Sequence, residues 1–264
     1  MPKVLICGRG GSGKSTLVTM LAKGLAEQGR DKVLVIDSDE SNLGLGKMLD
    51  IQPPARTVMD SLGGKEAVGK SLMAALRSEG TEEVKMFSGD FTFGDIAADS
   101  VSWSGTVGLA QIGKVEHAHE GCACPMGALA REFLNKVRDK KKEWVIVDTE
   151  AGVEHFGRGV LEGVDTVLMV VDPSYEAVLL AEKAAKLAKE AEKPFSVILN
   201  KVNADTEAQL KEMLKEKGIE VTAVLPFSAQ ISRANLVGEP LQITESLRQI
   251  LNELIGGIAN ANVH

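Results

Sequence analysis

The stretch Gly8-Arg9-Gly10-Gly11-Ser12-Gly13-Lys14-Ser15-Thr16 lies between an apolar run at 3–7 and a helical pattern at 17–28. A strand, a glycine-rich loop and a helix in this order form the setting of a phosphate-binding loop. Glycines let backbone N–H groups curl around an anion, and the helix adds its positive end. Lys14 can then reach the β- and γ-phosphates, and the Ser15 hydroxyl can ligate Mg²⁺. A flexible Gly/Ser turn explains neither residue, so we predict that this whole loop, Gly8 to Thr16, binds a nucleotide.

The composition is that of a globular protein with an aliphatic core. The chain has 264 residues, 44% of them hydrophobic and only 4% aromatic. This length allows one large domain or two small ones. Because every later element continues one alternating series of strands and helices, we expect a single domain over residues 1–264.

The charge and the hydropathy exclude several classes of partner. A net charge of −7 argues against a general affinity for nucleic acid or for an anionic membrane. No apolar run approaches the roughly 20 residues of a membrane span. The chain enters a strand almost at once, which does not fit a signal peptide. We therefore expect a cytoplasmic protein with no membrane span and no nucleic-acid partner.

The alternation of elements predicts the fold class. We expect strands at 3–7, 32–36, 107–112, 144–148, 164–171, 195–199 and 221–225, and helices at 17–28, from 126 to about 138, and at 175–192, 204–217 and 243–255. Residues 40–100 are broken by Pro and Gly into short helices and loops. Strands alternating with helices predict an α/β fold of the P-loop NTPase type, with a mainly parallel, doubly wound sheet flanked by helices.

Acidic residues follow two of the predicted buried strands. Asp37 and Asp39 come at the end of 32–36, where ligands sit in doubly wound sheets. Asp also forms turns, so a ligand role is favoured for Asp39 and less so for Asp37. The strand ending at Asp148 has the form of a Walker B element, which places this carboxylate near a Mg²⁺-bound water. Residues 149–155 follow it as a second switch segment.

The segment Asn200-Lys201-Val202-Asn203 differs by one residue from the Asn-Lys-x-Asp signature for guanine. A carboxylate there accepts two N–H donors of the base, whereas the amide of Asn203 presents a donor of its own. A mismatched buried hydrogen bond discriminates strongly between ligands. We therefore predict ATP, with Asn200 as a contact for adenine and Asn203 as a helix cap.

Potential metal ligands gather in residues 116–125. Cys122 and Cys124 lie there with His117 and His119, an unusual density of soft or borderline ligands. For the histidines an exposed polar loop is the simpler interpretation; for the cysteine pair, metal binding is favoured over packing. Two thiolates at i and i+2 cannot complete a tetrahedral site, but a two-fold dimer brings four sulfurs together. Cys7 ends a strand and is interpreted as a small buried hydrophobe.

The phosphate-binding loop resembles the deviant Walker A loop of the MinD/ParA/nitrogenase-iron-protein class. That class carries a lysine directly after the first glycine, and this lysine reaches the phosphates of the partner subunit in a nucleotide-sandwich dimer. Here Arg9 stands at that position. Arginine keeps the charge and binds phosphate well through its planar fork. The resemblance implies a homodimer promoted by nucleotide or metal, with Arg9 and Lys14 as catalytic cations.

Two further segments narrow the resemblance. Cys122-Ala123-Cys124 and the element from Asp148 to His155 together resemble the CooC family, accessory ATPases that mature nickel carbon monoxide dehydrogenase. This resemblance implies Mg²⁺-dependent ATP hydrolysis, with Asp39 positioning the water and Asp148 supporting the metal. It also implies that Cys122 and Cys124 bind Ni²⁺, with Zn²⁺ as a competitor, and that the partner is an apo nickel enzyme.

Two other functions compete with nickel delivery. An iron–sulfur reductase of the nitrogenase iron-protein type holds its cluster with cysteines far apart, the second beyond Walker B, but no cysteine follows Cys124 here. A positioning ATPase of the ParA or MinD kind requires a basic DNA-binding face or a basic amphipathic membrane helix. The segment 241–258 contains two acids and only Arg248 as a base. A positioning role also leaves the cysteine pair unexplained.

Overall fold

A mostly parallel sheet forms the centre of the computed structural model, which describes residues 1–30, 32–77, 86–114, 124–138, 142–153, 156 and 159–261. Within these residues eight strands pair in the order β3-β4-β2-β5-β1-β6-β7-β8, and only the β3–β4 pair is antiparallel. The strands are β1 (Lys3–Gly8), β2 (Lys32–Asp37), β3 (Ser102–Ser104), β4 (Val107–Gln111), β5 (Glu143–Asp148), β6 (Thr166–Val171), β7 (Phe195–Val202) and β8 (Val221–Pro226). The predicted fold class is confirmed.

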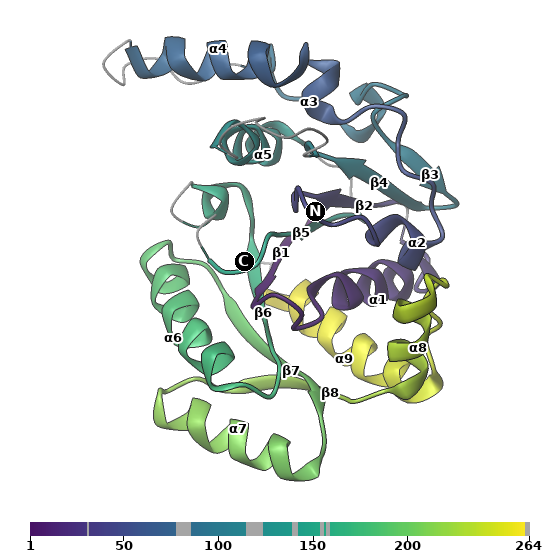
Figure 1. Cartoon of the computed structure of the whole chain (residues 1–264), viewed down its shortest axis with the longest axis vertical. Coiled ribbons are helices and arrows are strands. Elements are labelled where there is room, and N and C mark those ends of the chain that lie inside the picture. The colour runs from purple at the N-terminus through teal and green to yellow at the C-terminus, as the bar shows by residue number, and fades with distance from the viewer. Residues whose placement is uncertain are drawn as a thin grey trace.

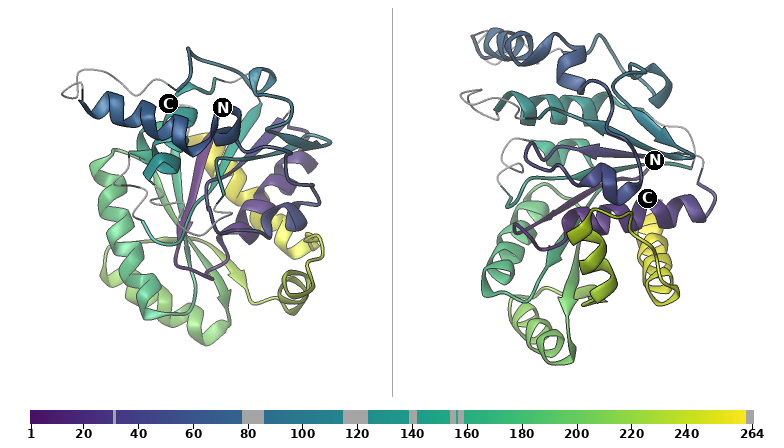
Figure 2. Two further views of the ribbon diagram at one scale, coloured as in Figure 1. Left: turned by 45° about the horizontal axis from the view of Figure 1, so that its top comes forward. Right: turned by 45° about the vertical axis from the view of Figure 1, so that its right-hand side comes forward.

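Helices cover both faces of the sheet. They are α1 (Lys14–Glu27), α2 (Leu45–Leu49), α3 (Val58–Ser61), α4 (Gly64–Arg77), α5 (Cys124–Lys136), α6 (Tyr175–Glu190), α7 (Ala204–Glu216), α8 (Ala229–Val237) and α9 (Glu245–Ala261), with short 3-10 turns at Phe93–Asp95 and Val160–Gly163. Figures 1 and 2 show α1 and α9 on one face and α5, α6 and α7 on the other. No helix in the described part of the chain has the length and apolar character that crossing a bilayer requires.

Two apolar cores follow from this layering. One contains β-strand side chains packed with α1, α2 and α9, and the other contains those packed with α3 to α7. The central strands are buried along nearly their whole length, because helices cover both of their faces. This explains why they read in the sequence as continuous hydrophobic runs instead of alternating ones. Helix α4 packs on α5 and forms the outermost layer on its side (Figure 1).

The carboxyl ends of three neighbouring strands bring the predicted site residues to one edge. Strand β5 lies between β1 and β2, and its last residue, Asp148, pairs in register with Ile6 of β1 and Asp37 of β2. Gly8 ends β1 immediately beside them. In doubly wound sheets a crevice opens at this edge, where successive connections leave in opposite directions.

Four elements differ from the sequence prediction. Helix α4 spans 14 residues within a region expected to hold only short helices and loops. Strand β3 is a three-residue edge strand, too short to show a pattern. Helix α8 was missed because only Ala234 of its residues is buried, so no apolar periodicity marks it. The first helix also begins at Lys14, inside the glycine loop, instead of at residue 17.

An aromatic cluster beneath α5 tests the contribution of the second core. Phe133 is 1% exposed and its ring packs edge-on against Phe87 and Phe91, with ring centroids 5.9 and 5.0 Å away. We predict that Phe133→Ala lowers the free energy of unfolding by about 3–5 kcal/mol, since removal of this buried ring leaves a cavity in the core. Urea unfolding measures this loss.

The same substitution at a surface position serves as the control. Phe227 is 60% exposed, and Phe227→Ala is expected to change the free energy of unfolding by no more than about 0.5 kcal/mol. Equal losses in the two variants would contradict the assignment of Phe133 to the core.

Candidate functional site

At two positions the glycine loop adopts a backbone conformation that residues with a side chain cannot adopt. Gly8 and Gly13 have φ values of 152° and 101°. A Cβ atom at Gly8 would lie 2.6 Å from the carbonyl oxygen of Val170, and one at Gly13 would lie 2.1 Å from Nδ2 of Asn200. Both positions therefore need glycine for conformation and for space. The glycine pattern in the sequence thus matches this backbone, and nucleotide binding by these residues stays a prediction.

Helix α1 begins inside the loop with its positive end free to face a ligand. Gly13 is the N-cap residue, and in the described structure no side chain caps it. The first turn, Lys14 to Thr16, also contains no acidic residue. The Lys14 side chain is buried, and its Nζ lies 3.5 Å from the carbonyl oxygen of Arg9. Backbone N–H groups and an ammonium directed at one point form a site for phosphate.

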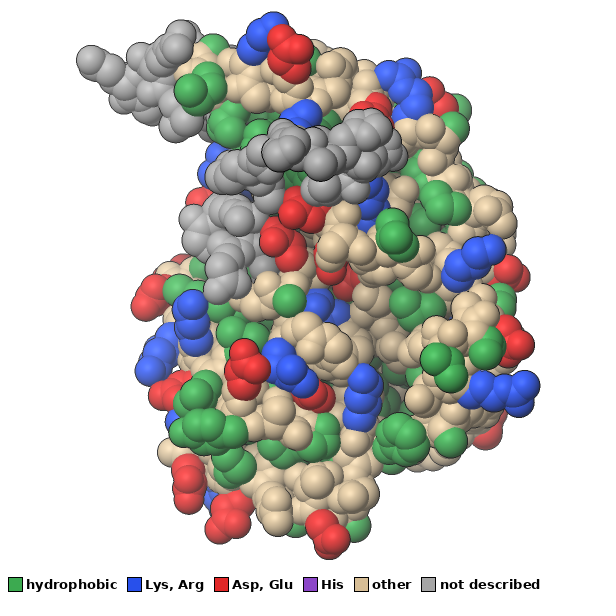
Figure 3. Space-filling view, viewed as in Figure 1, with side chains coloured by type: hydrophobic (Ala, Val, Ile, Leu, Met, Phe, Trp, Pro, Cys, Tyr) green, Lys and Arg blue, Asp and Glu red, His purple; other side chains and the backbone are tan. Residues whose placement is uncertain are grey.

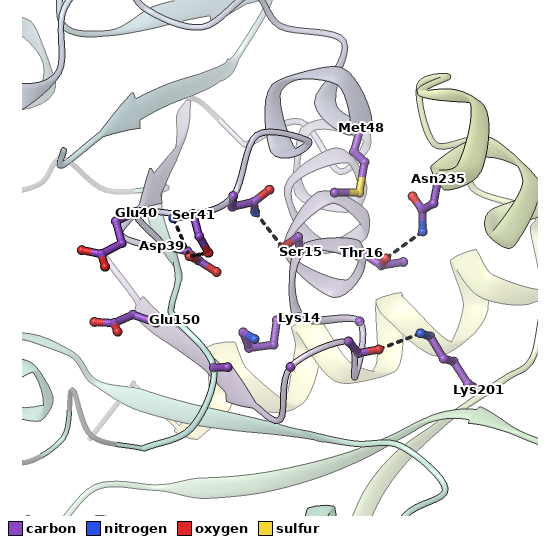
Figure 4. Close-up of a pocket in the computed structure, with 15 residues that line it drawn as sticks. Lys14, Ser15, Thr16, Asp39, Glu40, Ser41, Met48, Glu150, Lys201 and Asn235 are labelled. Atoms are coloured by element: carbon purple, nitrogen blue, oxygen red, sulfur yellow. Dashed lines mark hydrogen bonds between the residues drawn. The ribbon is translucent and has the colours of Figure 1, made fainter. Parts of the chain in front are cut away.

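A cavity of about 630 Å³ opens above the loop (Figure 4). Its lining comes from the glycine loop and the start of α1, from the segments after β2 and β5, and from α2, β7 and α8. It consists of Gly10, Gly11, Gly13, Lys14, Ser15, Thr16, Asp39, Glu40, Ser41, Asn42, Met48, Glu150, Ala151, Lys201 and Asn235. Figure 3 shows acidic side chains gathered at the hollow in the middle of the molecule, with basic ones below them. The volume suits a nucleotide-sized ligand.

Ser15 and Asp148 meet at the inner end of the cavity. The Ser15 hydroxyl donates to Asp148 Oδ2 at 2.6 Å, and Nδ2 of Asn42 donates to both of these oxygens, at 2.9 and 3.0 Å. Within the described residues Asp148 Oδ1 is buried without a hydrogen-bond partner. Burial raises the pKa of Asp148 to about 7, although the hydrogen bond from Ser15 opposes this.

The oxygen atoms of Ser15 and Asp148 fit Mg²⁺ as ligands. A hydroxyl and a carboxylate with an unused oxygen are hard oxygen ligands, and Mg²⁺ commonly binds one or two carboxylates together with waters and phosphates. Ser15 and Asp148 are therefore the residues that would hold it. Among the residues that the structure describes, no three His, Cys, Asp or Glu side chains gather in a metal-binding group.

A buried ion pair supports the segment after β2. Lys114 Nζ lies 2.6 Å from Asp37 Oδ2, and both side chains are almost fully buried. The same ammonium donates to the carbonyl oxygens of Asp39 and Asn42, at 2.5 and 2.7 Å. Burial raises the pKa of Asp37, although Lys114 opposes this. Asp37 thus supports the loop from below, whereas Asp39 lines the cavity.

The second segment next to the cavity follows β5. Glu150 and Ala151 line the cavity, and the N–H of Gly152 donates to the carbonyl oxygen of Gly8 at 3.1 Å. This bond joins the segment to the glycine loop. Glu154 and His155, which belong to the same predicted switch, lie outside the described residues.

Arg9 is bound by its own chain. Its Nη2 lies 2.6 Å from Asp172 Oδ2, its Nε lies 3.4 Å from Asp172 Oδ1, and Glu176 lies 4.0 Å away. The hydrogen bond that Arg9 donates to the Asp172 carboxylate raises the pKa of Arg9. Arg9 does not line the cavity in this chain, so its role across a dimer stays a prediction.

Asn200 and Asn203, both in the segment predicted to recognise the base, lie in different surroundings. Nδ2 of Asn200 donates to the carbonyl oxygen of Ser12 at 2.8 Å, beneath the glycine loop, while Lys201 and Asn235 line the cavity. Contact between Asn200 and adenine stays a prediction. Asn203 caps α7, with Oδ1 accepting from the N–H of Thr206 at 2.9 Å; the prediction of a cap is confirmed.

The cysteines fall into two groups. Cys7 is fully buried with its Sγ 3.5 Å from the sulfur of Met169, and burial raises its pKa to about 12. The interpretation of Cys7 as a buried hydrophobe is confirmed. Cys122, His117 and His119 lie outside the described residues, and Cys124 is known only as the first residue of α5. Metal binding by the cysteine pair stays a prediction.

Sequence reasoning missed four residues that shape the site. They are Asn42, Lys114, Asp172 and Asn235. Asn42 donates to Ser15, and Lys114 donates to the carbonyl oxygen of Asp39. Asp172 pairs with Arg9, and Asn235 donates to Thr16 Oγ1 at 3.3 Å. The first three follow the strands β2, β4 and β6 within a few residues. A search of every strand's carboxyl end would have found them. Asn235 lies on α8 and has no such signal.

The raised pKa of Asp148 predicts how stability depends on pH. The folded pKa of about 7 exceeds the unfolded value of 3.8, so the stabilising effect of the neutral carboxyl is greatest at low pH and is lost as pH rises through 7. Without metal or nucleotide, we expect the wild-type chain to lose about 2 kcal/mol of unfolding free energy relative to Asp148→Asn between about pH 5.5 and about pH 8. Urea unfolding in EDTA measures this; a constant difference would contradict it.

Comparisons with known proteins agree with this geometry. An ATP-binding protein of Methanocaldococcus jannaschii, described as uncharacterised, is 41% identical over 239 residues, 90% of this chain and 93% of that protein. The carbon monoxide dehydrogenase accessory protein CooC of Rhodospirillum rubrum is 30% identical over 247 residues, 89% of this chain and 88% of that protein.

The fold matches that of a solved structure. The septum site-determining protein MinD complexed with Mg-ADP, from Pyrococcus horikoshii, superposes with a TM-score of 0.66 at 17% identity, covering 97% of this chain and 95% of that one. The family described as the CobQ/CobB/MinD/ParA nucleotide binding domain matches residues 3–241. The chain belongs to this family of nucleotide-binding domains.

Proposed function

We propose that the chain is an ATP-dependent metallochaperone of the CooC type. It hydrolyses ATP, binds Ni²⁺ or Zn²⁺ through Cys122 and Cys124 at the interface of a homodimer, and assists nickel insertion into apo carbon monoxide dehydrogenase or a related nickel enzyme. The observation that carries this proposal is the similarity to CooC over 89% of the chain, combined with the Cys-x-Cys pair at 122–124.

The residues around the cavity support ATP hydrolysis. Lys14 and the N–H groups of α1 bind and orient the phosphates, while Asp39 accepts a hydrogen bond from the attacking water and directs it. When bound by Ser15 and Asp148, Mg²⁺ neutralises charge on the phosphates. The buried ammonium of Lys14 is already directed at the cavity, so little rearrangement is required for catalysis.

Exposed apolar side chains support a dimer that closes over this cavity. Leu43 and Leu236 are 88% and 83% exposed, and each follows directly a residue that lines the cavity. Large apolar side chains this exposed at the edge of a site favour contact with another protein surface. A second copy facing the cavity would cover them and would bring two Cys122–Cys124 pairs to one ion, as four-coordinate Zn²⁺ and related ions require.

Lys114 supplies a route between nucleotide and metal. It is the last described residue before the segment that contains Cys122, and its ammonium binds the carbonyl oxygens of Asp39 and Asn42 next to the cavity. A shift of the loop 39–42 on nucleotide binding would therefore act on the start of that segment.

The packing of α9 disfavours a membrane-positioning function. The apolar side chains of α9 are already buried, and α9 contacts α1. A membrane-binding amphipathic helix needs an apolar face that is free.

Metal titration tests the proposal. The protein, purified without a metal-binding tag, is titrated with Ni²⁺ and with Zn²⁺, with and without ATP or ADP, while absorbance and oligomer mass are followed. We expect thiolate charge-transfer bands that saturate at about one ion per dimer. Cys122→Ser and Cys124→Ser should each abolish them, whereas Cys7→Ala, at the buried cysteine, should keep them.

The alternative functions give different results in the same titration. A brown protein containing iron and acid-labile sulfide would favour an iron–sulfur reductase of the nitrogenase iron-protein type. Binding that does not depend on Cys122 or Cys124 would remove metal delivery and leave a dimeric ATPase.

Mixing two inactive variants tests whether Arg9 acts across the dimer. Arg9→Ala and Asp39→Ala should each abolish hydrolysis alone. In a mixed dimer the Arg9→Ala subunit keeps its own Asp39 and receives Arg9 from its partner, so one site works. We expect an equimolar mixture to recover about a quarter of wild-type ATPase activity, since about half the dimers are mixed and each has one complete site. No recovery would show that Arg9 acts within its own chain, as its pairing with Asp172 allows.

A further inference from the structure

The side chain of Asn42 lies between the two groups that fit Mg²⁺. Its Nδ2 is 2.9 Å from Ser15 Oγ and 3.0 Å from Asp148 Oδ2, and these two oxygens are 2.6 Å apart. The three atoms form a closed triangle of hydrogen bonds. A polar N–H group thus occupies the point where a cation would meet the hydroxyl and the carboxylate.

The orientation of this amide is fixed by its other end. Oδ1 of Asn42 accepts from the N–H of Gly44 at 2.9 Å. A flipped amide would lose this bond and would place its oxygen against the carboxylate of Asp148, which is an acceptor. The donor end therefore faces Ser15 and Asp148.

An amide donor and Mg²⁺ compete for these two oxygens. Mg²⁺ binds oxygen atoms at about 2.0–2.1 Å in a near-ideal octahedron. A cation that binds Ser15 Oγ and Asp148 Oδ2 together would use lone pairs of these oxygens on the side that the amide of Asn42 faces. Since an N–H donor carries no lone pair for a metal, Asn42 competes with the ion instead of binding it.

We propose that Asn42 is a latch that occupies the cation position in the nucleotide-free protein and leaves Ser15 and Asp148 when a magnesium–nucleotide complex binds. This inference rests on the proposed function, in that it requires ATP or ADP to bind with Mg²⁺ in this cavity. It adds that the loop 39–42 responds to the metal and not to the nucleotide alone.

Release of the latch acts on the rest of the loop. The carbonyl oxygens of Asp39 and Asn42 both accept from Lys114, so the two ends of this short segment share one anchor. Leu43, directly after Asn42, is almost fully exposed and does not pack in the core. The segment can therefore move around Lys114 once the side-chain bonds of Asn42 break, and Asp39 moves with it.

Binding of fluorescent ADP across a series of Mg²⁺ concentrations tests the latch without turnover. We expect Asn42→Ala to lower the Mg²⁺ concentration for half-maximal binding about tenfold, the effect of losing one hydrogen bond to a charged group. ADP affinity in EDTA should stay unchanged. Phe227→Ala, at an exposed position that does not line the cavity, should leave both values unchanged.

A second variant controls for a change in loop structure caused by loss of the Gly44 hydrogen bond. Asn42→Asp keeps an oxygen for the N–H of Gly44 and removes the competing donor, so its Mg²⁺ requirement should also fall. A higher Mg²⁺ requirement in Asn42→Ala, as expected if the amide holds a metal-bound water, would overturn the latch while leaving the nucleotide site intact. A wild-type chain that binds no ADP with or without Mg²⁺ would overturn both the latch and the proposed function.

Discussion

Burial of the Asp148 carboxylate is the constraint around which this site is built. A buried carboxylate is unfavourable unless donors or a cation face it. Here Ser15 and Asn42 donate to one oxygen, and the other is left without a partner among the described residues. Burial raises the pKa of Asp148 despite the hydrogen bond from Ser15. A bound cation would stabilise the charged form of this carboxylate. The register of β5 between β1 and β2 imposes this position, because it sets Asp148 beside Ile6 and Asp37 at the same edge.

A second buried carboxylate, Asp37, lies on the neighbouring strand β2 and, unlike Asp148, is paired with a cation. Asp37 receives a full positive partner, Lys114, together with Gln111. A buried pair of this kind contributes little net stability but is costly to break. It therefore acts as a rigid anchor for the loop above it. The same edge of the sheet thus contains one carboxylate fixed by a cation and one that is open to exchange.

Much of the fold and part of the site could be predicted from the sequence for physical reasons. Strands buried on both faces give continuous apolar runs, and the glycine loop is confined by the φ values at Gly8 and Gly13, so both leave clear patterns. Lys114 and Asp172 follow strands β4 and β6, but their pairing with Asp37 and Arg9 left no pattern, because these partners are distant in sequence and are determined by the strand order. Asn235 lies on a helix without apolar periodicity. Side-chain pairing across the edge of a sheet requires three-dimensional structure.

The charge of the cavity explains why metal and nucleotide should enter together. Asp39, Glu40 and Glu150 line it, with Asp148 beneath, against the cations Lys14 and Lys201. A nucleoside triphosphate without Mg²⁺ would bring further negative charge to this acidic wall. A complex that has already neutralised part of that charge meets less repulsion. The acidic lining and the amide of Asn42 therefore work in the same direction, since both make the loop next to Asp39 sensitive to the cation that accompanies the phosphates.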